Sequence, residues 1–187
     1  MNVLPNVSME TPEFLAWVQG REGRYELAER RVVMMTGGSR GHAIVLRRLA
    51  SALEKRLDGD RWAVLTSDFG VEPGPRTIRY PDVVVDVAGG RIDDLVATAP
   101  TLIAEVVSPS SATQDLGDKA AEYLQLPSLK AYLVLSQDEP KVWAWVRDAA
   151  GFPCGPQVIT GHDARIEIAA LGVTLPLADI YAGLAER

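Results

Sequence analysis

The chain has 187 residues, of which 47% are hydrophobic and 24% are charged, a composition typical of a globular protein with a well-buried core. This length predicts a single domain spanning residues 1–187. The 19 basic and 25 acidic residues give a net charge of −6, which argues against broad non-specific attraction to phosphate backbones. The single cysteine, Cys154, excludes an internal disulfide and a thiolate zinc cluster.

The sequence shows no sign of membrane attachment or export. No N-terminal segment combines a basic start with an apolar stretch. No run approaches the roughly 18 apolar residues that a membrane span requires. We therefore expect a cytoplasmic protein with no membrane partner.

The first half of the chain alternates short strands with helices. Apolar residues that recur at spacings of three and four predict helices, and β-branched runs between turn residues predict strands. The expected elements are a short helix from Pro12 that Thr11 caps, strands at 25–27 and 32–35, a long helix from about Gly41 to Leu57, strands at 62–65 and 69–72, and a break at Pro73-Gly74-Pro75.

The second half contains the most strand-like runs. Its expected elements are a strand that begins at Pro81, a loop with a polar helical turn at 89–100, a strand at 102–107, one helix at 112–126, a hairpin of 131–135 with 142–146, short strands near 158, at 166–168 and at 173–175, and a helix at 177–184. This mixture predicts an α/β (α+β) fold with one central sheet flanked by helices.

Two of these apolar strands carry a carboxylate, Asp82 at the start of one and Glu105 inside the other. Burying an unpaired carboxylate costs several kcal/mol, so such a residue is usually paired, hydrogen-bonded or bound to a metal. Asp82 has the alternative of capping the turn after Pro81. Glu105 lies between Ala104 and Val106 and has no obvious solvated face. The two carboxylates, with a lysine one helix away, suit a hard-cation site.

Other candidate residues are open to two interpretations. Lys119 follows Asp115 by four residues, which predicts either a helix surface pair or, with the carboxylates, a site residue. Glu26 is either an arginine-paired sheet residue or a ligand, and His42 is either a capping and packing residue or a catalyst. Trp143 and Trp145 share one strand face, as a packing pair, a dimer surface or a base-stacking platform.

A cluster of basic residues occupies the long predicted helix. Its members are Arg47, Arg48, Lys55 and Arg56. Net charge does not report how charge is distributed, so a local basic face remains compatible with an acidic chain. The cluster is either a solvated helix face or such a basic face.

From Phe14 to the strand at 132–134, the sequence resembles the Uma2 family, also called DUF820. The resemblance rests on Pro81-Asp82, on Glu105-Val106-Val107-Ser108-Pro109-Ser110, and on Asp115, Lys119 and Tyr123 in that order and spacing. It implies a restriction-endonuclease-like fold of the PD-(D/E)XK type.

The resemblance also implies a function, that of a metal-dependent endonuclease that cleaves phosphodiester bonds of nucleic acid, DNA rather than RNA. It implies that Asp82 and Glu105, helped by the backbone carbonyl of Val106, bind Mg²⁺ or Mn²⁺, and that Lys119 lies beside the attacking water. Glu26, His42 and Asp115 are its accessory positions. A homodimer is also expected, because exposed sheet edges invite pairing.

The chain departs from the usual patterns at three places, one of which is the strand at 132–135, where the tryptophan and aspartate often seen in the family are absent. The position two residues after Glu105, which carries a lysine in the usual nuclease motif, is Val107, and Lys119 from the following helix takes its place. The first hairpin, at 28–31, lacks the glycine that is usual in the family. A non-catalytic binding or scaffold protein that keeps the nuclease-like fold is the alternative function, and the acidic net charge favours it.

Overall fold

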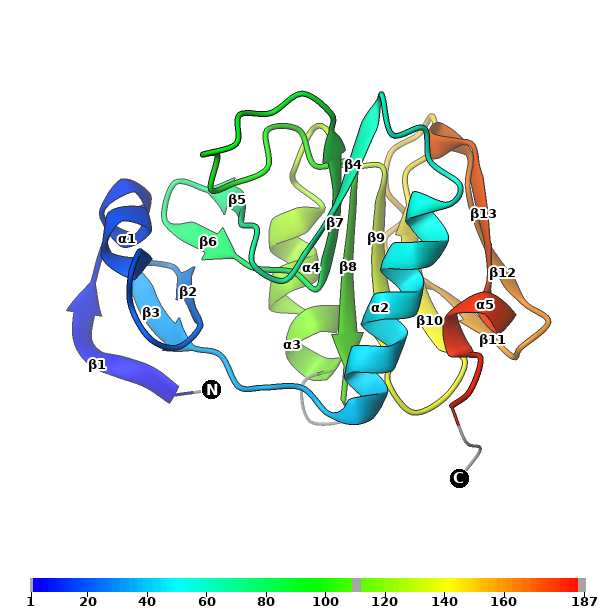
Figure 1. The fold of residues 1–187 in the computed structure, drawn as a ribbon, viewed down its shortest axis with the longest axis horizontal. Helices are drawn as coiled ribbons and strands as arrows, with labels where there is room; N and C mark the ends of the chain where they lie inside the picture. The colour runs from blue at the N-terminus through cyan, green and yellow to red at the C-terminus, as the bar shows by residue number, and fades with distance from the viewer. Residues whose placement is uncertain (1, 109–111, 185–187) are drawn as a thin grey trace.

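The computed structural model describes residues 2–108 and 112–184, and its largest element is a six-stranded sheet of order β11-β10-β9-β8-β7-β4 (Figure 1). The strands are β4 (Trp62–Thr66), β7 (Val83–Val87), β8 (Leu102–Val107), β9 (Ala131–Ser136), β10 (Lys141–Val146) and β11 (Gln157–Thr160). Neighbours in this sheet are antiparallel except β8 and β9, which run parallel. The expected mixed central sheet is confirmed.

The parallel pair β8 and β9 needs a crossover connection, and two short helices supply it. These are α3 (Ala112–Leu116) and α4 (Asp118–Tyr123). The prediction of one continuous helix over 112–126 is wrong, because Gly117 has φ −109° and ψ −93° and interrupts it. Glycine adopts such a backbone at low steric cost. The motif positions Pro109 and Ser110 lie outside the described residues.

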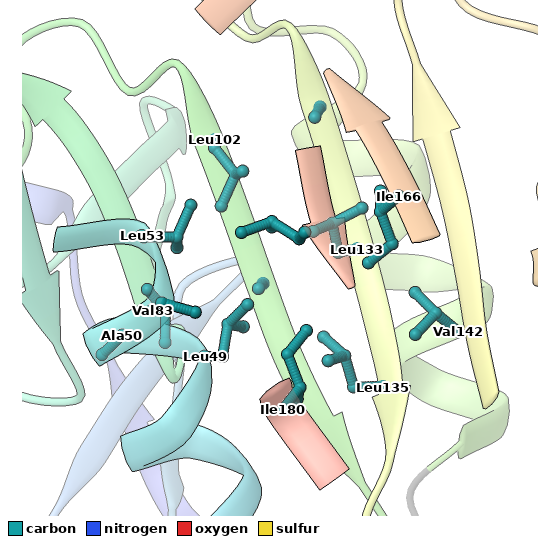
Figure 2. Close-up of a cluster of buried hydrophobic side chains, with 14 of the residues drawn as sticks. Leu49, Ala50, Leu53, Val83, Leu102, Leu133, Leu135, Val142, Ile166 and Ile180 are labelled. Atoms are coloured by element: carbon teal, nitrogen blue, oxygen red, sulfur yellow. The ribbon is translucent and has the colours of Figure 1, made fainter. Parts of the chain in front are cut away.

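Helices lie on both faces of the sheet (Figure 1). One face is covered by α2 (Arg40–Glu54), by α5 (Leu177–Tyr181), and by a two-stranded sheet of β12 (Arg165–Ile168) and β13 (Val173–Pro176), which a 3₁₀ turn at Ala169–Leu171 connects. The other face is covered by α4. Figure 2 shows the core on the α2 side, where Leu49 and Leu53 of α2 meet Leu102 and Leu133 of the sheet.

The side chains of β8 alternate between the two faces of the sheet. Leu102, Ala104 and Val106 join the core under α2, whereas Ile103 and Val107 join the core under α4. Successive side chains of a strand point to opposite faces, so Glu105 belongs to the α4 side. This alternation is what directs the Glu105 carboxylate toward α4 rather than toward α2.

A second sheet of five strands lies beside the first, at the left of Figure 1. Its order is β1 (Asn2–Ser8), β3 (Arg31–Met34), β2 (Tyr25–Ala28), β6 (Thr77–Arg79) and β5 (Val71–Gly74). Strands β1 and β6 were not predicted. The break expected at Pro73-Gly74-Pro75 begins only at Pro75, because Pro73 and Gly74 belong to β5 and a turn follows them. This strand lies at the edge of the sheet, where proline removes no essential ladder hydrogen bond.

The N-terminal helix α1 (Thr11–Val18) packs its fully buried Phe14 against this second sheet. Pro12 lies in its first turn as expected. The predicted cap is wrong, because Glu10 occupies the cap position and the Thr11 hydroxyl donates instead to Glu72 Oε1 at 2.8 Å. The Thr11 hydroxyl therefore bonds a residue that is distant in the sequence instead of capping its own helix.

The hairpin between β2 and β3 turns through Glu29 and Arg30, whose φ angles are 45° and 68°. Positive φ at both central residues is the pattern of a type I′ turn, where glycine or asparagine is favoured. The absent family glycine therefore coincides with a turn that these two residues make in an unfavourable conformation.

The remaining differences concern element boundaries. Strand β7 begins at Val83, one residue after Asp82, and α5 ends at Tyr181 rather than Leu184. The segment 89–100 forms a loop without the expected helical turn. Among the helices of the described ranges, none is long and apolar enough to cross a membrane.

Candidate active site

A pocket of about 300 Å³ opens where the two sheets meet the N-terminus of α2. Every predicted site residue lines it, and they come from six different segments: Glu26, His42, Asp82, Glu105, Val106, Asp115 and Lys119. The loop from Met35 to Ser39 forms a further wall. The fold therefore brings together residues that are spread over most of the sequence.

Asp82 lies directly before the first residue of β7, and 9% of its surface is exposed. Its Oδ2 accepts a hydrogen bond from the Val106 backbone N–H at 2.7 Å and lies 3.0 Å from Nε2 of His42. The backbone bond ties Asp82 to the strand that carries Glu105. The alternative that Asp82 only caps the turn after Pro81 is not what the structure shows.

His42 lies in the first turn of α2, and its ring contacts a carboxylate of the pocket. Its backbone N–H donates to Ser39 Oγ at 3.1 Å, which caps α2, while its ring contacts Asp82. The ring is a partner of the carboxylate rather than a packing group. A histidine that holds a carboxylate in one orientation prepares that carboxylate for a ligand.

Glu105 and Lys119 form the centre of the site. Lys119 Nζ lies 2.9 Å from Glu105 Oε1, 3.0 Å from Asp115 Oδ1 and 3.9 Å from Glu26 Oε1. The Tyr123 hydroxyl donates to the same Glu105 oxygen at 3.2 Å. The pair with Asp115 exists as the helical spacing predicted, but it is buried rather than on the surface, and Lys119 is also a pocket residue.

Arg79 supports this centre from the second sheet and was not predicted as a site residue. Its guanidinium bonds both oxygens of Glu122, at 2.8 and 2.7 Å, and Glu26 Oε2 at 3.2 Å. Arg79 and Glu26 are each 2% exposed. Glu26 is thus paired to an arginine and also faces Lys119. An arginine inside the apolar run Ile78–Tyr80 was the sequence signal for this role.

Burial and neighbouring charges shift the pKa values of three side chains in the pocket. Burial raises the pKa of Glu105 to about 8, because the charge of Lys119 compensates its desolvation only in part and Asp82 and Asp115 repel it. Burial also raises the pKa of Asp115. The pKa of Lys119 is raised despite its own burial, since Glu105, Glu26 and Asp115 surround it. Lys119 is therefore charged, and the carboxylates around it outnumber the available cations.

Few side chains of the pocket could bind a divalent metal together. Within residues 2–108 and 112–184, no group of three or more His, Cys, Asp or Glu side chains could hold a metal ion. Asp82 and Glu105 supply two carboxylates, and the chain at Val106 lies beside them. Such a set fits a hard cation that keeps several of its waters, as Mg²⁺ does.

Two glycines near the start of α2 allow the backbone to lie close to neighbouring groups. A Cβ on Gly38 would lie 2.7 Å from the His42 ring, and a Cβ on Gly41 would lie 2.9 Å from the Gln137 backbone oxygen. Ser39 donates to Gln137 Oε1 at 2.8 Å across the same contact. The N-terminus of α2 is therefore held against the loop that follows β9.

The tryptophan pair lies away from this pocket. Trp145 is 4% exposed and stacks on Tyr132 with ring centroids 5.5 Å apart, whereas Trp143 is half-buried in the same cluster. The Tyr132 hydroxyl donates to the Asp115 carbonyl at 2.8 Å. The packing interpretation of the pair is confirmed for Trp145, which supports the helix segment that carries Asp115.

Two known proteins are similar to this chain in sequence. The chain is 28% identical over 185 residues to the uncharacterized protein slr1290 of Synechocystis, covering 97% of this chain and 94% of the relative. It is 26% identical over 129 residues to the uncharacterized protein sll1609 of Synechocystis, covering 67% of this chain and 73% of that protein.

A solved structure has the same fold. It is described as "a putative nuclease belonging to DUF820 from Anabaena variabilis", with a TM-score of 0.75 at 14% identity over 95% of this chain and 99% of that chain. The Uma2 family model, described as "Putative restriction endonuclease", matches residues 11–178. Because that match covers most of the sequence, the chain belongs to the Uma2 family.

Proposed function

We propose that this protein is a metal-dependent endonuclease that hydrolyses phosphodiester bonds of nucleic acid, with DNA favoured over RNA. One observation carries the proposal: Lys119 Nζ lies 2.9 Å from Glu105 in a pocket that Asp82 also lines. Two carboxylates can hold a hard cation that activates water for phosphodiester hydrolysis, and an adjacent lysine can offset the negative charge that develops on the phosphate. The family description and the shared fold of the Anabaena protein support it.

In this proposal, Asp82, Glu105 and the Val106 carbonyl hold Mg²⁺ or Mn²⁺. When bound, such a cation activates water and offsets the charge that grows on the phosphate oxygens. Lys119 orients the attacking water and adds positive charge near those oxygens, which is most effective in a pocket with little bulk water. His42 fixes the orientation of Asp82 through its 3.0 Å contact.

The residues around Lys119 act as positioning groups. Asp115 and Glu26 hold the ammonium group toward Glu105, and Arg79 holds Glu26 in turn. Because Lys119 comes from a helix rather than from β8, its direction depends on these contacts. The geometry that the usual motif builds within one strand is built here between the strand and α4.

The test uses purified protein with supercoiled plasmid and with single-stranded DNA and RNA, in magnesium, manganese or chelator. We expect metal-dependent cleavage by the wild type, and its loss in Asp82→Ala and Glu105→Ala. Lys119→Ala should slow cleavage by about 100-fold or more, the usual effect of removing one electrostatic stabiliser. Glu167→Ala, which changes an exposed carboxylate on β12, is the matched control and should cleave as the wild type does.

Absence of both cleavage and metal binding would contradict the catalytic proposal. If wild-type protein neither cleaves these substrates nor binds manganese in calorimetry, while remaining folded, the catalytic proposal fails. The non-catalytic binding or scaffold function would then be the better account of the same fold.

A further inference from the structure

A second hollow, of about 370 Å³, lies between the C-terminal half of α2 and α5, away from the candidate active site. Figure 1 shows these two helices side by side on the same face of the large sheet. The hollow, here called the basic groove, is lined by Arg47, Arg48, Lys55 and Arg56, with Asp179 as its acidic residue. The basic cluster noted in the sequence therefore lines a concave surface.

Most of this positive charge has no partner within the described part of the chain. Arg56 pairs with Asp179 at 2.5 Å. Arg48 Nε is buried and has no hydrogen-bond partner. Arg47 and Lys55 are exposed and form no side-chain hydrogen bond or ion pair with any described residue. Like charges gathered at a concave surface repel one another, so the groove favours an anion.

The chemistry of the groove favours phosphate over carboxylate-bearing proteins. Three of its four cations are arginines, whose planar fork bonds two phosphate oxygens at once. The surrounding protein carries a net charge of −6, and the candidate active site holds more carboxylates than cations. A polyanionic substrate is therefore repelled by most of this molecule and needs a local basic surface for attachment.

The groove and the pocket lie on the same helix. His42 contacts Asp82 near the start of α2, and Arg48 lies six residues later, about 9 Å along the helix axis at 1.5 Å per residue. Phosphates of one strand in a DNA duplex repeat about every 3.4 Å along its axis. A nucleic acid strand that runs from the pocket along α2 would reach the groove within a few nucleotides.

We propose that the basic groove docks the phosphate backbone of the nucleic acid substrate, outside the candidate active site. The proposal rests on the proposed function for the identity of its ligand. Arg47 and Lys55 make contacts with the phosphates at the open edge, and Arg48 adds positive charge from the groove wall.

Binding is measured by fluorescence anisotropy of a labelled DNA duplex in chelator, which prevents cleavage, over a range of salt concentrations. The variants are Arg47→Gln, Lys55→Gln and the double variant. The matched control is the double variant Arg31→Gln with Arg91→Gln, which removes the same charge from two exposed positions elsewhere.

Each lost phosphate contact should lower the slope of log affinity against log salt by about 0.9. We expect the groove double variant to lose roughly 1.8 in slope, the two single variants about half of that each, and the control double variant to keep the wild-type slope. Duplexes of different sequence should give the same result, because backbone contacts carry no sequence information.

Three results would overturn the inference. The first is an unchanged slope and affinity in the groove double variant. The second is displacement of the duplex by inorganic pyrophosphate at equal phosphate concentration, which would assign the groove to a small phosphate compound. The third is a change in mass by light scattering in the groove variants with unaltered DNA binding, which would make the groove a contact between copies.

The outcomes separate the two proposals. Metal-dependent plasmid cleavage with no groove effect supports the endonuclease and overturns the groove. Groove-dependent duplex binding without cleavage in any metal supports the groove and overturns the endonuclease, leaving a nucleic-acid-binding protein.

Discussion

Arg79 is the residue on which the interior of the site depends most. It lies between Glu26 and Glu122 and is almost wholly buried. Its pKa is raised despite burial, because both carboxylates stabilise its charged form. It connects the small sheet to α4, so Arg79 is a link between elements as well as an ion pair.

Replacing Arg79 with alanine should lower the free energy of unfolding by about 3–5 kcal/mol, the usual cost of leaving a buried charge without its partner. Arg79→Lys keeps the charge but loses the two-pronged bond to Glu122, and should lie between alanine and wild type. Urea unfolding followed by circular dichroism measures all three proteins. If alanine costs less than 1 kcal/mol, the pair contributes no more than a surface salt bridge does.

Glu105 should destabilise the metal-free protein as pH rises. Its folded pKa of about 8 lies above the ordinary value of 4.5, so the folded state retains a proton that the unfolded state has lost. Stability from this group is complete below about pH 4.5 and is lost as pH rises through 8. Glu105→Gln removes this titration.

The expected outcome is that Glu105→Gln gains stability relative to wild type between pH 5 and pH 8 in chelator, as measured by urea unfolding at each pH. Glu167→Gln, at an exposed position, should follow the wild-type pH profile. A constant difference between Glu105→Gln and wild type across this range would show that Glu105 is ionised throughout.

At the scale of elements, the placement of α2 decides the shape of the pocket. Its N-terminus lies against the loop after β9, because Gly41 leaves room for the Gln137 carbonyl and Ser39 bonds the Gln137 side chain. Its inner side is fixed by Leu49 and Leu53, which are fully buried (Figure 2). His42 therefore reaches Asp82 from a rigid helix rather than from a loop.

Gly41→Ala should lower the free energy of unfolding by about 1 kcal/mol. Alanine is normally the better helix former, but crowding against backbone costs about 1–3 kcal/mol and outweighs that gain. Gly59→Ala is the control, since a Cβ there meets nothing within 4 Å. Thermal unfolding compares the two variants, and equal effects would mean that the contact with Gln137 relaxes freely.

At the scale of the whole molecule, a metal held between Asp82 and Glu105 would stabilise the folded state. A ligand at 100 times its dissociation constant adds about 2.7 kcal/mol. Manganese should therefore raise the melting temperature of wild-type protein and leave Asp82→Ala unchanged. Differential scanning fluorimetry with and without chelator measures this. An equal rise in both proteins would place any manganese binding elsewhere.

The homodimer also stays a prediction at this scale. The large sheet ends in β4 on one side and β11 on the other, and the small sheet ends in β1 and β5. Unpaired edge strands are the surfaces through which a second copy would pair. Light scattering of the purified protein should give twice the monomer mass of 20.2 kDa, and the monomer mass would contradict the expectation.

Local patterns in the sequence were enough to predict several elements. The spacing of apolar residues predicted α2, and the β-branched runs predicted β8, β9 and β10. Asp82 and Glu105 stood out because burying a charge in an apolar strand is unfavourable unless the charge has a partner. The order of the motif residues indicated the family before any contact between them was known.

Which groups meet one another depends on contacts between residues that are distant in the sequence. Thr11 bonds Glu72 rather than its own helix, and Arg79 reaches Glu122 from another sheet. Lys119 has both its helical partner Asp115 and the distant Glu105, although spacing could indicate only the first. Short strands such as β6 and the interruption at Gly117 also escaped prediction. The physical reason is that local propensity is worth a few tenths of a kcal/mol per residue, whereas burying a charge or a strand edge costs several and is settled by distant neighbours.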